Sequence, residues 1–202
     1  TSALSLMIKQ GDNVIDVGAN IGIISVLMAR LVGTSGKVVS FEPVPRLYNI
    51  LEQTIALNRC VDIVVPHQVV VCDGSQETIQ IYTPNERSHA CSSLKVAEPA
   101  SATVHACSTI SLDKIDATFG LPSLIKVDVE GAEMSVLQGS IGLCSKKQPP
   151  IWVLEVNRSA ANRFEYMPED LVTWLAHYNY DYFWWSDEKS ILPFEVGSSF
   201  IS

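Results

Sequence analysis

Short apolar runs alternate with helix-spaced apolar positions along the first part of the chain. Residues 13–17 (NVIDV) and 36–41 (GKVVSF) are apolar runs bounded by turn residues, which predicts two buried strands. Between them, apolar residues recur at helical spacing from Ile21 to Leu31, and Gly33 is placed to end the helix. A strand, a helix and a strand in this order predict a right-handed crossover between two parallel strands.

The same alternation continues toward the C-terminal end. The pattern predicts further helices over 46–58, 111–119, 131–139 and 168–177, and further strands over 67–72, 123–129 and 151–156. The stretches YDYFWW and ILPFEV, separated by SDEKS, predict a closing antiparallel hairpin. These elements predict one α/β domain over residues 1–202, with a doubly wound, mostly parallel, seven-stranded Rossmann-like sheet and helices on both faces.

Residues 73–108 depart from this pattern. The segment alternates apolar and polar residues and is rich in Ser, Thr and Pro, which predicts antiparallel pieces over 77–83 and 102–108. Long polar connections in α/β enzymes often cover a binding site. We therefore expect a lid-like excursion over one end of the sheet.

Composition limits the classes of partner. Hydrophobic residues make up 47% of the 202 positions and charged residues 18%, which fits a well-buried domain. The net charge of −8 argues against nucleic acid, because binding to phosphates rests on Lys and Arg. The sequence contains no stretch of 18 uncharged apolar residues that would predict a membrane segment. An odd number of cysteines without CxxC spacing predicts reduced thiols and a cytoplasmic location; they are Cys60, Cys72, Cys91, Cys107 and Cys144.

The segment after the first predicted strand has the composition of a ligand-binding turn. Ligands of open parallel sheets bind at the carboxyl ends of the strands. Asp16 lies at the end of the first strand, and Gly18 and Gly22 lie in the turn, where glycine lets the backbone approach a ligand closely. Glu42 ends the second strand, where a carboxylate can accept hydrogen bonds from two ribose hydroxyls. These positions predict a nucleoside site.

The spacing of the glycines distinguishes between nucleosides. A dinucleotide site has the pattern GxGxxG, and the run GANIG lacks the middle glycine. The pattern DxGxxxG, followed by an acidic end to the second strand, resembles the S-adenosylmethionine (SAM) site of class I methyltransferases. SAM carries no phosphate, so its site requires less space at the turn than a dinucleotide site. The carboxylate of Asp16 is also compatible with the ammonium group of SAM. The alternative is that both glycines serve helix packing and that Asp16 caps a turn.

Five blocks of sequence together resemble the FkbM family of SAM-dependent methyltransferases. They are IDVGANIG, VSFEPVPRLYNILEQTIALN, SLDKI, LIKVDVEGAEMSVLQGS and WVLEV, and the resemblance runs from about Gly11 to Asp181. KVDVEGAE is the most specific block. The resemblance implies a class I fold and O-methylation of sugars, polyketide-type products or other small hydroxylated molecules, without choosing among these acceptors.

The turn and the resemblance together give a predicted cofactor site. Its residues are Asp16, Gly18, Ala19, Asn20, Gly22, Glu42, Asp73 and Asp128. Asp73 follows the third predicted strand, where related folds place an adenine contact, although VCDGS matches the family loosely. Asp128 ends the fourth predicted strand, where it would contact the methionine amino group, orient the acceptor, or do both.

Methyl transfer to an alcohol requires an aligned acceptor and a group that takes its proton. The candidates for these catalytic roles are Asp128, Glu130, Glu155 and His89. His89 lies in the excursion and could close over a substrate, although a lone loop histidine is more often solvated. Glu130 and Glu133 are neighbours at a helix start, where acidic residues also suit the helix dipole.

Three carboxylates, those of Asp128, Glu130 and Glu155, could instead hold a divalent cation such as Mg²⁺. We favour a carboxylate base without metal. The aromatic residues over 178–185 could form an acceptor shelf or a homodimer contact, but core packing is the favoured interpretation.

Other classes of function remain open to different degrees. The glycine spacing disfavours a nicotinamide-dependent oxidoreductase. Nucleic-acid amino-methyltransferases usually carry a Pro-Pro-aromatic stretch after the fourth strand, where this sequence has DVE. The sequence is also compatible with a non-catalytic SAM-binding module or a methyltransferase-like partner subunit.

Overall fold

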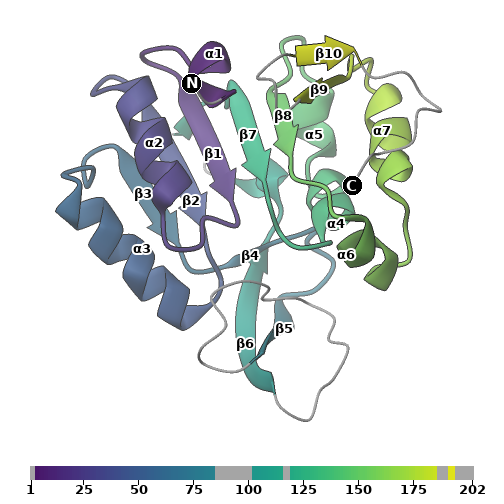
Figure 1. Ribbon diagram of the computed structural model, residues 1–202, viewed down its shortest axis with the longest axis horizontal. Coiled ribbons are helices and arrows are strands. Elements are labelled where there is room, and N and C mark those ends of the chain that lie inside the picture. The colour runs from purple at the N-terminus through teal and green to yellow at the C-terminus, as the bar shows by residue number, and fades with distance from the viewer. Residues whose placement is uncertain (1–2, 85–101, 116–118, 186–190, 194–202) are drawn as a thin grey trace.

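The computed structural model describes residues 3–84, 102–115, 119–185 and 191–193. Its central sheet has five parallel strands in the order β3-β2-β1-β7-β8 (Figure 1). The strands are β1 (Asn13–Val17), β2 (Lys37–Phe41), β3 (Val64–His67), β7 (Leu124–Val127) and β8 (Ile151–Leu154). The chain moves outward from β1 to β3 and then returns to the other side of β1, so the predicted doubly wound α/β topology is confirmed. Within the described residues, however, this sheet has five strands rather than seven.

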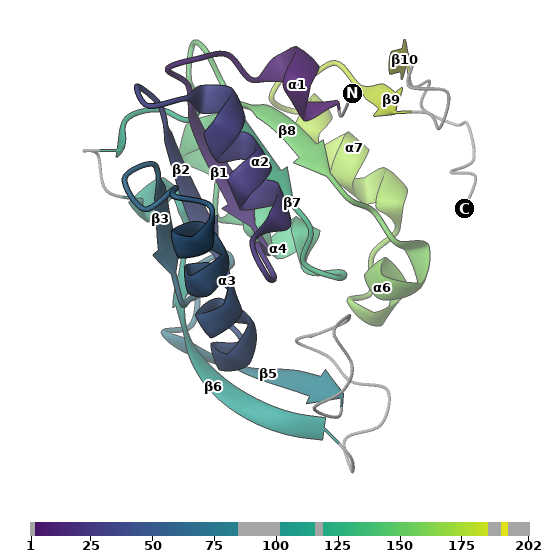
Figure 2. The same ribbon diagram turned by 60° about the vertical axis from the view of Figure 1, so that its left-hand side comes forward.

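Helices α1 (Leu4–Met7), α2 (Ile23–Val32) and α3 (Pro45–Leu57) cover one face of the sheet (Figure 2). Alternate strand residues, such as Val14 and Val38, point to this face and pack with Met28 and Leu51. The period of two along each strand makes this possible. Polar residues two positions further along the same strands therefore point to this face as well.

The opposite face is covered by shorter helices. Helices α4 (Glu133–Gln138) and α5 (Ile141–Cys144) pack on residues such as Ile15 and Ile125. Helix α7 (Pro168–Ala176) packs beside β8 and α4, and α6 (Arg158–Arg163) precedes it in the chain.

Coverage of this second face is incomplete over β2 and β3. Within the described residues, the part of the helix predicted over 111–119 that can be seen begins with a 3₁₀ turn, η2 (Leu112–Lys114), and 116–118 lie outside the described residues. A groove of about 540 Å³ therefore opens over Val39, Phe41 and Val65. Helices on both faces are thus confirmed only in part.

The third predicted strand was placed too late in the sequence. The run 67–72 divides between the end of β3 and a separate strand, β4 (Val70–Val71), because the chain leaves the central sheet after His67. Strand β4 joins β6 (Ala102–Ile110) and β5 (Thr78–Pro84) in a small mixed sheet. The two antiparallel pieces predicted in the excursion are confirmed by the β5–β6 ladder.

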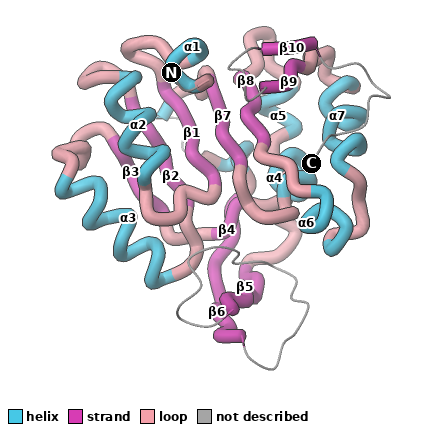
Figure 3. The backbone as a smooth tube through the Cα atoms, in the orientation of Figure 1, coloured by secondary structure: helices cyan, strands magenta, loops and turns pink. Residues whose placement is uncertain are grey.

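The small sheet lies beyond the carboxyl ends of the central strands (Figure 3). Its side chains Ile81 and Cys107 pack against Val44 and Leu47 at the start of α3. Residues 85–101 lie outside the described part of the chain, so the role of the excursion as a lid stays a prediction.

At the C-terminal end, β9 (Phe183–Trp185) and β10 (Ile191–Pro193) pair antiparallel in a two-stranded sheet of their own. Tyr178, Tyr180 and Tyr182 pack around Leu171 and Leu175, whereas Phe183 is 64% exposed, so core packing describes these tyrosines and not Phe183. The four described cysteines are buried and unpaired, while Cys91 lies outside the described residues. Within the described part of the chain, no helix has both the length and the apolar character needed to span a membrane.

Candidate functional site

A row of buried polar residues crosses the three central strands. Asp16 on β1 lies directly opposite Ser40 on β2 and Lys126 on β7. Each occupies the last position but one of its strand, and each is at most 9% exposed. All three share the face that packs under α2, so the row lies close to the carboxyl edge, where ligands of parallel sheets bind.

The row is held together by hydrogen bonds and an ion pair. Ser25, in the first turn of α2, donates its hydroxyl to Asp16 Oδ2 at 2.6 Å, and Ser40 donates to the Ser25 Oγ at 2.9 Å. Lys126 Nζ lies 3.2 Å from Asp16 Oδ1. Asp16 is fully buried, with Oδ2 hydrogen-bonded and Oδ1 facing the Lys126 ammonium without a hydrogen bond, and it supports the turn from inside the core.

The glycine turn rests directly on the backbone that follows β7. Gly18 has a φ of +77°, and a Cβ at this position would lie 1.9 Å from the carbonyl oxygen of Asp128. The backbone N–H groups of Gly18 and Ala19 both donate to the carbonyl of Phe41, at 3.0 and 2.9 Å. The turn is therefore fixed against β2 and β7, and only glycine fits its first position.

Glu42 lies against this turn. Its Oε2 accepts the backbone N–H of Asn20 at 2.8 Å, and its Oε1 accepts that of Val44 at 2.9 Å. The side chain is 4% exposed, and burial raises the pKa of Glu42 to about 7 against these two hydrogen bonds, which lower it. Each oxygen retains a second lone pair for a ligand hydroxyl, so the geometry fits a ribose diol.

Asn20 and Gly22 complete the predicted turn. Asn20 has a φ of +53°, an uncommon conformation for a residue with a side chain, and its N–H is aimed at Glu42. Gly22 has a φ of +88° and precedes α2; a Cβ there would meet the Leu51 side chain at 2.6 Å. Nucleotide-pyrophosphate turns have glycine where this chain has Asn20, so the structure fits a nucleoside without a pyrophosphate better.

Asp73 is engaged in local contacts with the next turn and with α4. Its Oδ1 accepts the N–H of Ser75 at 2.9 Å, and its N–H donates to Ser135 Oγ of α4 at 3.2 Å. These bonds form a closed turn against α4. Contact with adenine stays a prediction for this residue.

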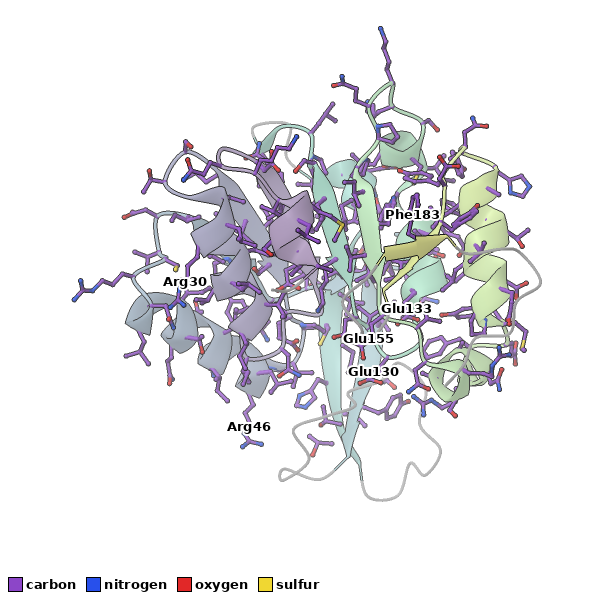
Figure 4. The ribbon with its side chains drawn as sticks, turned by 45° about the horizontal axis from the view of Figure 1, so that its top comes forward. Arg30, Arg46, Glu130, Glu133, Glu155 and Phe183 are labelled. Carbon is purple, nitrogen blue, oxygen red and sulfur yellow. The ribbon has the colours of Figure 1, made fainter. Side chains whose placement is uncertain are left out.

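Three carboxylates, those of Asp128, Glu130 and Glu155, interact beyond the ends of β7 and β8. Figure 4 shows Glu130 and Glu155 close to one another. Asp128 Oδ2 lies 3.3 Å from Lys126 Nζ, with its side chain 33% exposed. The negative charge of Asp128, followed by partial burial, raises the pKa of Glu155. Glu130, which has a φ of +55°, adds a smaller repulsion. The structure thus brings together three of the four predicted catalytic residues, and His89 lies outside the described residues.

Glu133 has a structural role. It is 2% exposed, its Oε1 accepts the N–H of Gly131 at 3.1 Å, and its Oε2 accepts the hydroxyl of Tyr166 at 2.6 Å. Burial, and then the hydrogen bond to Glu133, raise the pKa of Tyr166. Glu133 therefore braces the loop that carries Glu130 and Asp128.

The divalent cation considered from the sequence finds no support. No group of three or more His, Cys, Asp or Glu side chains among the described residues is arranged to hold a metal ion. The Lys126 ammonium already lies beside Asp128, so a positive charge is supplied by the chain itself.

Sequence reasoning missed the buried row except for Asp16. A signal was present, because Lys126 and Ser40 are single polar residues inside apolar strands, and buried charges require partners. The spacing alone did not show that the three strands bring these residues level with one another.

A doubly wound parallel sheet, a glycine turn after β1 and an acidic residue after β2 define the class of Rossmann-like, SAM-dependent methyltransferases. The sequence model of the methyltransferase FkbM domain matches residues 16–182, so the chain belongs to the FkbM methyltransferase family. A search of curated protein sequences finds no match.

Solved structures agree at the level of fold. The precorrin-6Y C5,15-methyltransferase of Geobacter metallireducens GS-15 aligns over 87% of this chain and 67% of its own, with 12% identity and a TM-score of 0.50. Fibrillarin of Aeropyrum pernix, solved with natively bound SAM, aligns over 32% of this chain and 26% of its own (22% identity, TM-score 0.29). A protein-L-isoaspartate O-methyltransferase aligns over 32% and 20% (23% identity, TM-score 0.30). The match thus spans less than two thirds of the length of the last two proteins.

Proposed function

We propose that this protein transfers a methyl group from SAM to a hydroxyl oxygen of a small molecule, with sugars and hydroxylated natural products as the acceptor class. One observation carries the proposal. The buried Glu42 carboxylate and the Asp128–Glu155 acid pair follow neighbouring strands of one sheet, on either side of the glycine turn after β1.

The residues that would hold SAM are those of the turn and Glu42. Glu42 would accept the ribose hydroxyls, while the backbone from Gly18 to Gly22 would border the methionine part. The acidic tip of β7 suits the ammonium group of that methionine. SAM supplies an activated methyl group and a neutral leaving group, so the protein has to align the acceptor and manage one proton.

The acid pair supplies that proton management. As the bond from the acceptor oxygen to the methyl carbon forms and the carbon–sulfur bond breaks, the hydroxyl proton has to leave the oxygen. A carboxylate of the Asp128–Glu155 pair would accept it. The raised pKa of Glu155 makes its ionised form a stronger base than an ordinary glutamate, and a placed base typically contributes about 10²–10⁴-fold.

Charge at the same tip favours an uncharged acceptor. Asp128, Glu130 and Glu155 bring three carboxylates together, and one buried ammonium faces them from Lys126. Phosphorylated or carboxylated acceptors would be repelled there, whereas hydroxyl groups can donate to the carboxylates. This supports a neutral, hydroxyl-rich molecule.

The first test is thermal unfolding with SAM, S-adenosylhomocysteine or NAD⁺. A ligand present at ~100 times its Kd stabilises the fold by about 2.7 kcal/mol, so a shift of several degrees is expected with both adenosyl compounds. A shift with NAD⁺ alone would overturn the proposal.

Turnover then separates an enzyme from a SAM-binding partner subunit. Formation of S-adenosylhomocysteine is measured against panels of neutral sugars, hydroxylated aromatic compounds and their phosphorylated analogues. We expect turnover with neutral acceptors only. Tight SAM binding without turnover on any panel would favour the non-catalytic alternative.

A further inference from the structure

Lys126 is the one buried cation in the described part of the site, and it connects the two halves of that site. Its Nζ lies 3.1 Å from the carbonyl oxygen of Gly18, 3.2 Å from Asp16 Oδ1 and 3.3 Å from Asp128 Oδ2. The ammonium group has three N–H donors, and three oxygens surround it. One of these oxygens belongs to the glycine turn and another to the acid pair.

We infer that Lys126 is a positioning residue for methyl transfer, whose ammonium fixes the Asp128 side chain in place relative to the glycine turn. Lys126 itself is 9% exposed and lies within the row under α2, so it does not reach the acceptor. It acts through Asp128. The inference deepens the proposed function, because it specifies how the acid pair is kept in a defined state.

The charges around Lys126 explain why such a cation is required. Asp16 approaches from β1, Asp128 from the end of β7, Glu155 from the end of β8 and Glu42 from the end of β2. Glu130 in the loop after β7 adds a further negative charge to Glu155. Without the ammonium, nothing among these groups would offset the repulsion that Asp128 and Glu130 exert on the Glu155 carboxylate.

The ammonium itself stays charged in this environment. Burial lowers the pKa of Lys126, but Asp16 and then Asp128 raise it more, so the net pKa is raised. A group with this balance is a permanent cation at neutral pH. It lowers the pKa of Glu155, while Asp128 raises it, so removing Lys126 changes the titration of the pair in a known direction.

Stability alone is a weak reason for a buried lysine here. Replacing a buried ion pair by apolar side chains is often neutral or favourable for folding. The neighbour of Lys126 in the same row on β8 is Val153, so an apolar residue is accommodated at this level of the sheet.

The test is a titration of carboxyl groups, which requires no acceptor. Protein labelled with ¹³C at the glutamate side-chain carboxyls is titrated by NMR, and the Glu155 signal is assigned by its loss in Glu155→Gln. In Lys126→Met the midpoint of the Glu155 signal should rise by about one pH unit. Lys126→Arg should restore most of the difference, and Lys147→Met, which removes one exposed surface charge, should leave the midpoint unchanged.

A second variant keeps the test decisive if Lys126→Met does not fold. Asp16→Asn removes the competing carboxylate and leaves the ammonium to Asp128, so the Glu155 midpoint should fall. An unchanged midpoint in Lys126→Met, or a rise in Asp16→Asn, would overturn the inference. Absence of SAM binding by the wild-type protein would instead refute the proposed function, whatever the titration shows.

Discussion

The two acidic ends of the site differ in how firmly they are held. On the proposed cofactor side, Glu42 is 4% exposed, and backbone N–H groups of Asn20 and Val44 occupy one lone pair of each oxygen. On the proposed acceptor side, Glu155 is exposed, and the described interactions of its carboxylate are with other side chains, chiefly Asp128. One carboxylate is fixed by backbone and the other by charge.

This difference matches what each side would recognise under the proposed function. A ribose diol is the same in every SAM molecule, so a rigid receptor is appropriate. Acceptors vary within a methyltransferase family, and a carboxylate whose position depends on neighbouring charges can adapt to them. Changes on the proposed cofactor side should therefore affect binding and folding, while changes on the proposed acceptor side should affect turnover.

The Asp128→Asn variant is expected to have the largest effect, and it tests whether the proposed acceptor side acts on turnover. We expect turnover to fall about 10³-fold, because the amide cannot take part in proton transfer with Glu155. SAM affinity should change far less. S-adenosylhomocysteine formation is measured with an acceptor that the panels identify, and Asp62→Asn, which changes an exposed carboxylate at the other end of the sheet, is the control. Activity close to that of the wild type would exclude a catalytic role for Asp128.

Gly18→Ala tests the rigid side through folding. The new Cβ would lie 1.9 Å from the Asp128 carbonyl oxygen at a φ of +77°, so the free energy of unfolding should fall by about 3 kcal/mol. Gly11→Ala is the matched control, since its φ is +85° but the nearest atom lies 3.5 Å away. It should cost only about 1 kcal/mol, from backbone strain. Equal losses in urea unfolding would show that the contact with β7 is unimportant.

Much of the rigid side could be predicted from the sequence, because its signals are local. The glycine turn, the start of α2 and Glu42 all lie within 30 residues, and strand periodicity placed β1 and β2 with nearly correct ends. The strand predicted over 67–72 was wrong because this largely apolar stretch was taken as one strand. The chain leaves the central sheet between His67, which ends β3, and Val70, which begins β4. Apolar character does not reveal which sheet a strand joins.

The acceptor side and the central row depend on contacts between distant residues. Asp128 and Glu155 were found because each ends an apolar run, but their closeness depends on the pairing of β7 with β8. Lys126 was missed because its partner Asp16 lies 110 residues earlier in the chain. Of the helix predicted over 111–119, the described residues show a 3₁₀ turn at Leu112–Lys114, where Leu112 is buried in the core while Ile115 lines the groove.

Glu42→Gln tests whether the backbone-held carboxylate binds ribose. The amide group would place an N–H₂ where one backbone N–H now donates and would remove one acceptor from the ligand. We expect SAM affinity to fall by about 10–100-fold in calorimetry, the value of one hydrogen bond to a charged group. Glu52→Gln, at an exposed position on α3, should bind as the wild type does. Equal affinities in the two variants would remove the ribose assignment.

The smallest expected effect is the pH dependence of SAM binding. Ribose hydroxyls donate hydrogen bonds, so they favour ionised Glu42, whose pKa is about 7 in the protein without ligand. Affinity should therefore rise by up to about tenfold between pH 6 and pH 8, and binding near pH 7 should release part of a proton. Calorimetry in two buffers with different ionisation enthalpies measures both quantities.

Unfolding without ligand should show the opposite trend for the same residue. The pKa of Glu42 is raised above its ordinary value of 4.5, so the contribution of Glu42 to stability is fully present below pH 4.5 and is lost as the pH rises through about 7. In Glu42→Gln, this part of the pH dependence should disappear from both the unfolding and the SAM-binding data. If the variant keeps the tenfold rise in affinity, another group carries it, and the contrast between a backbone-held carboxylate and a charge-held pair would have to be redrawn around that group.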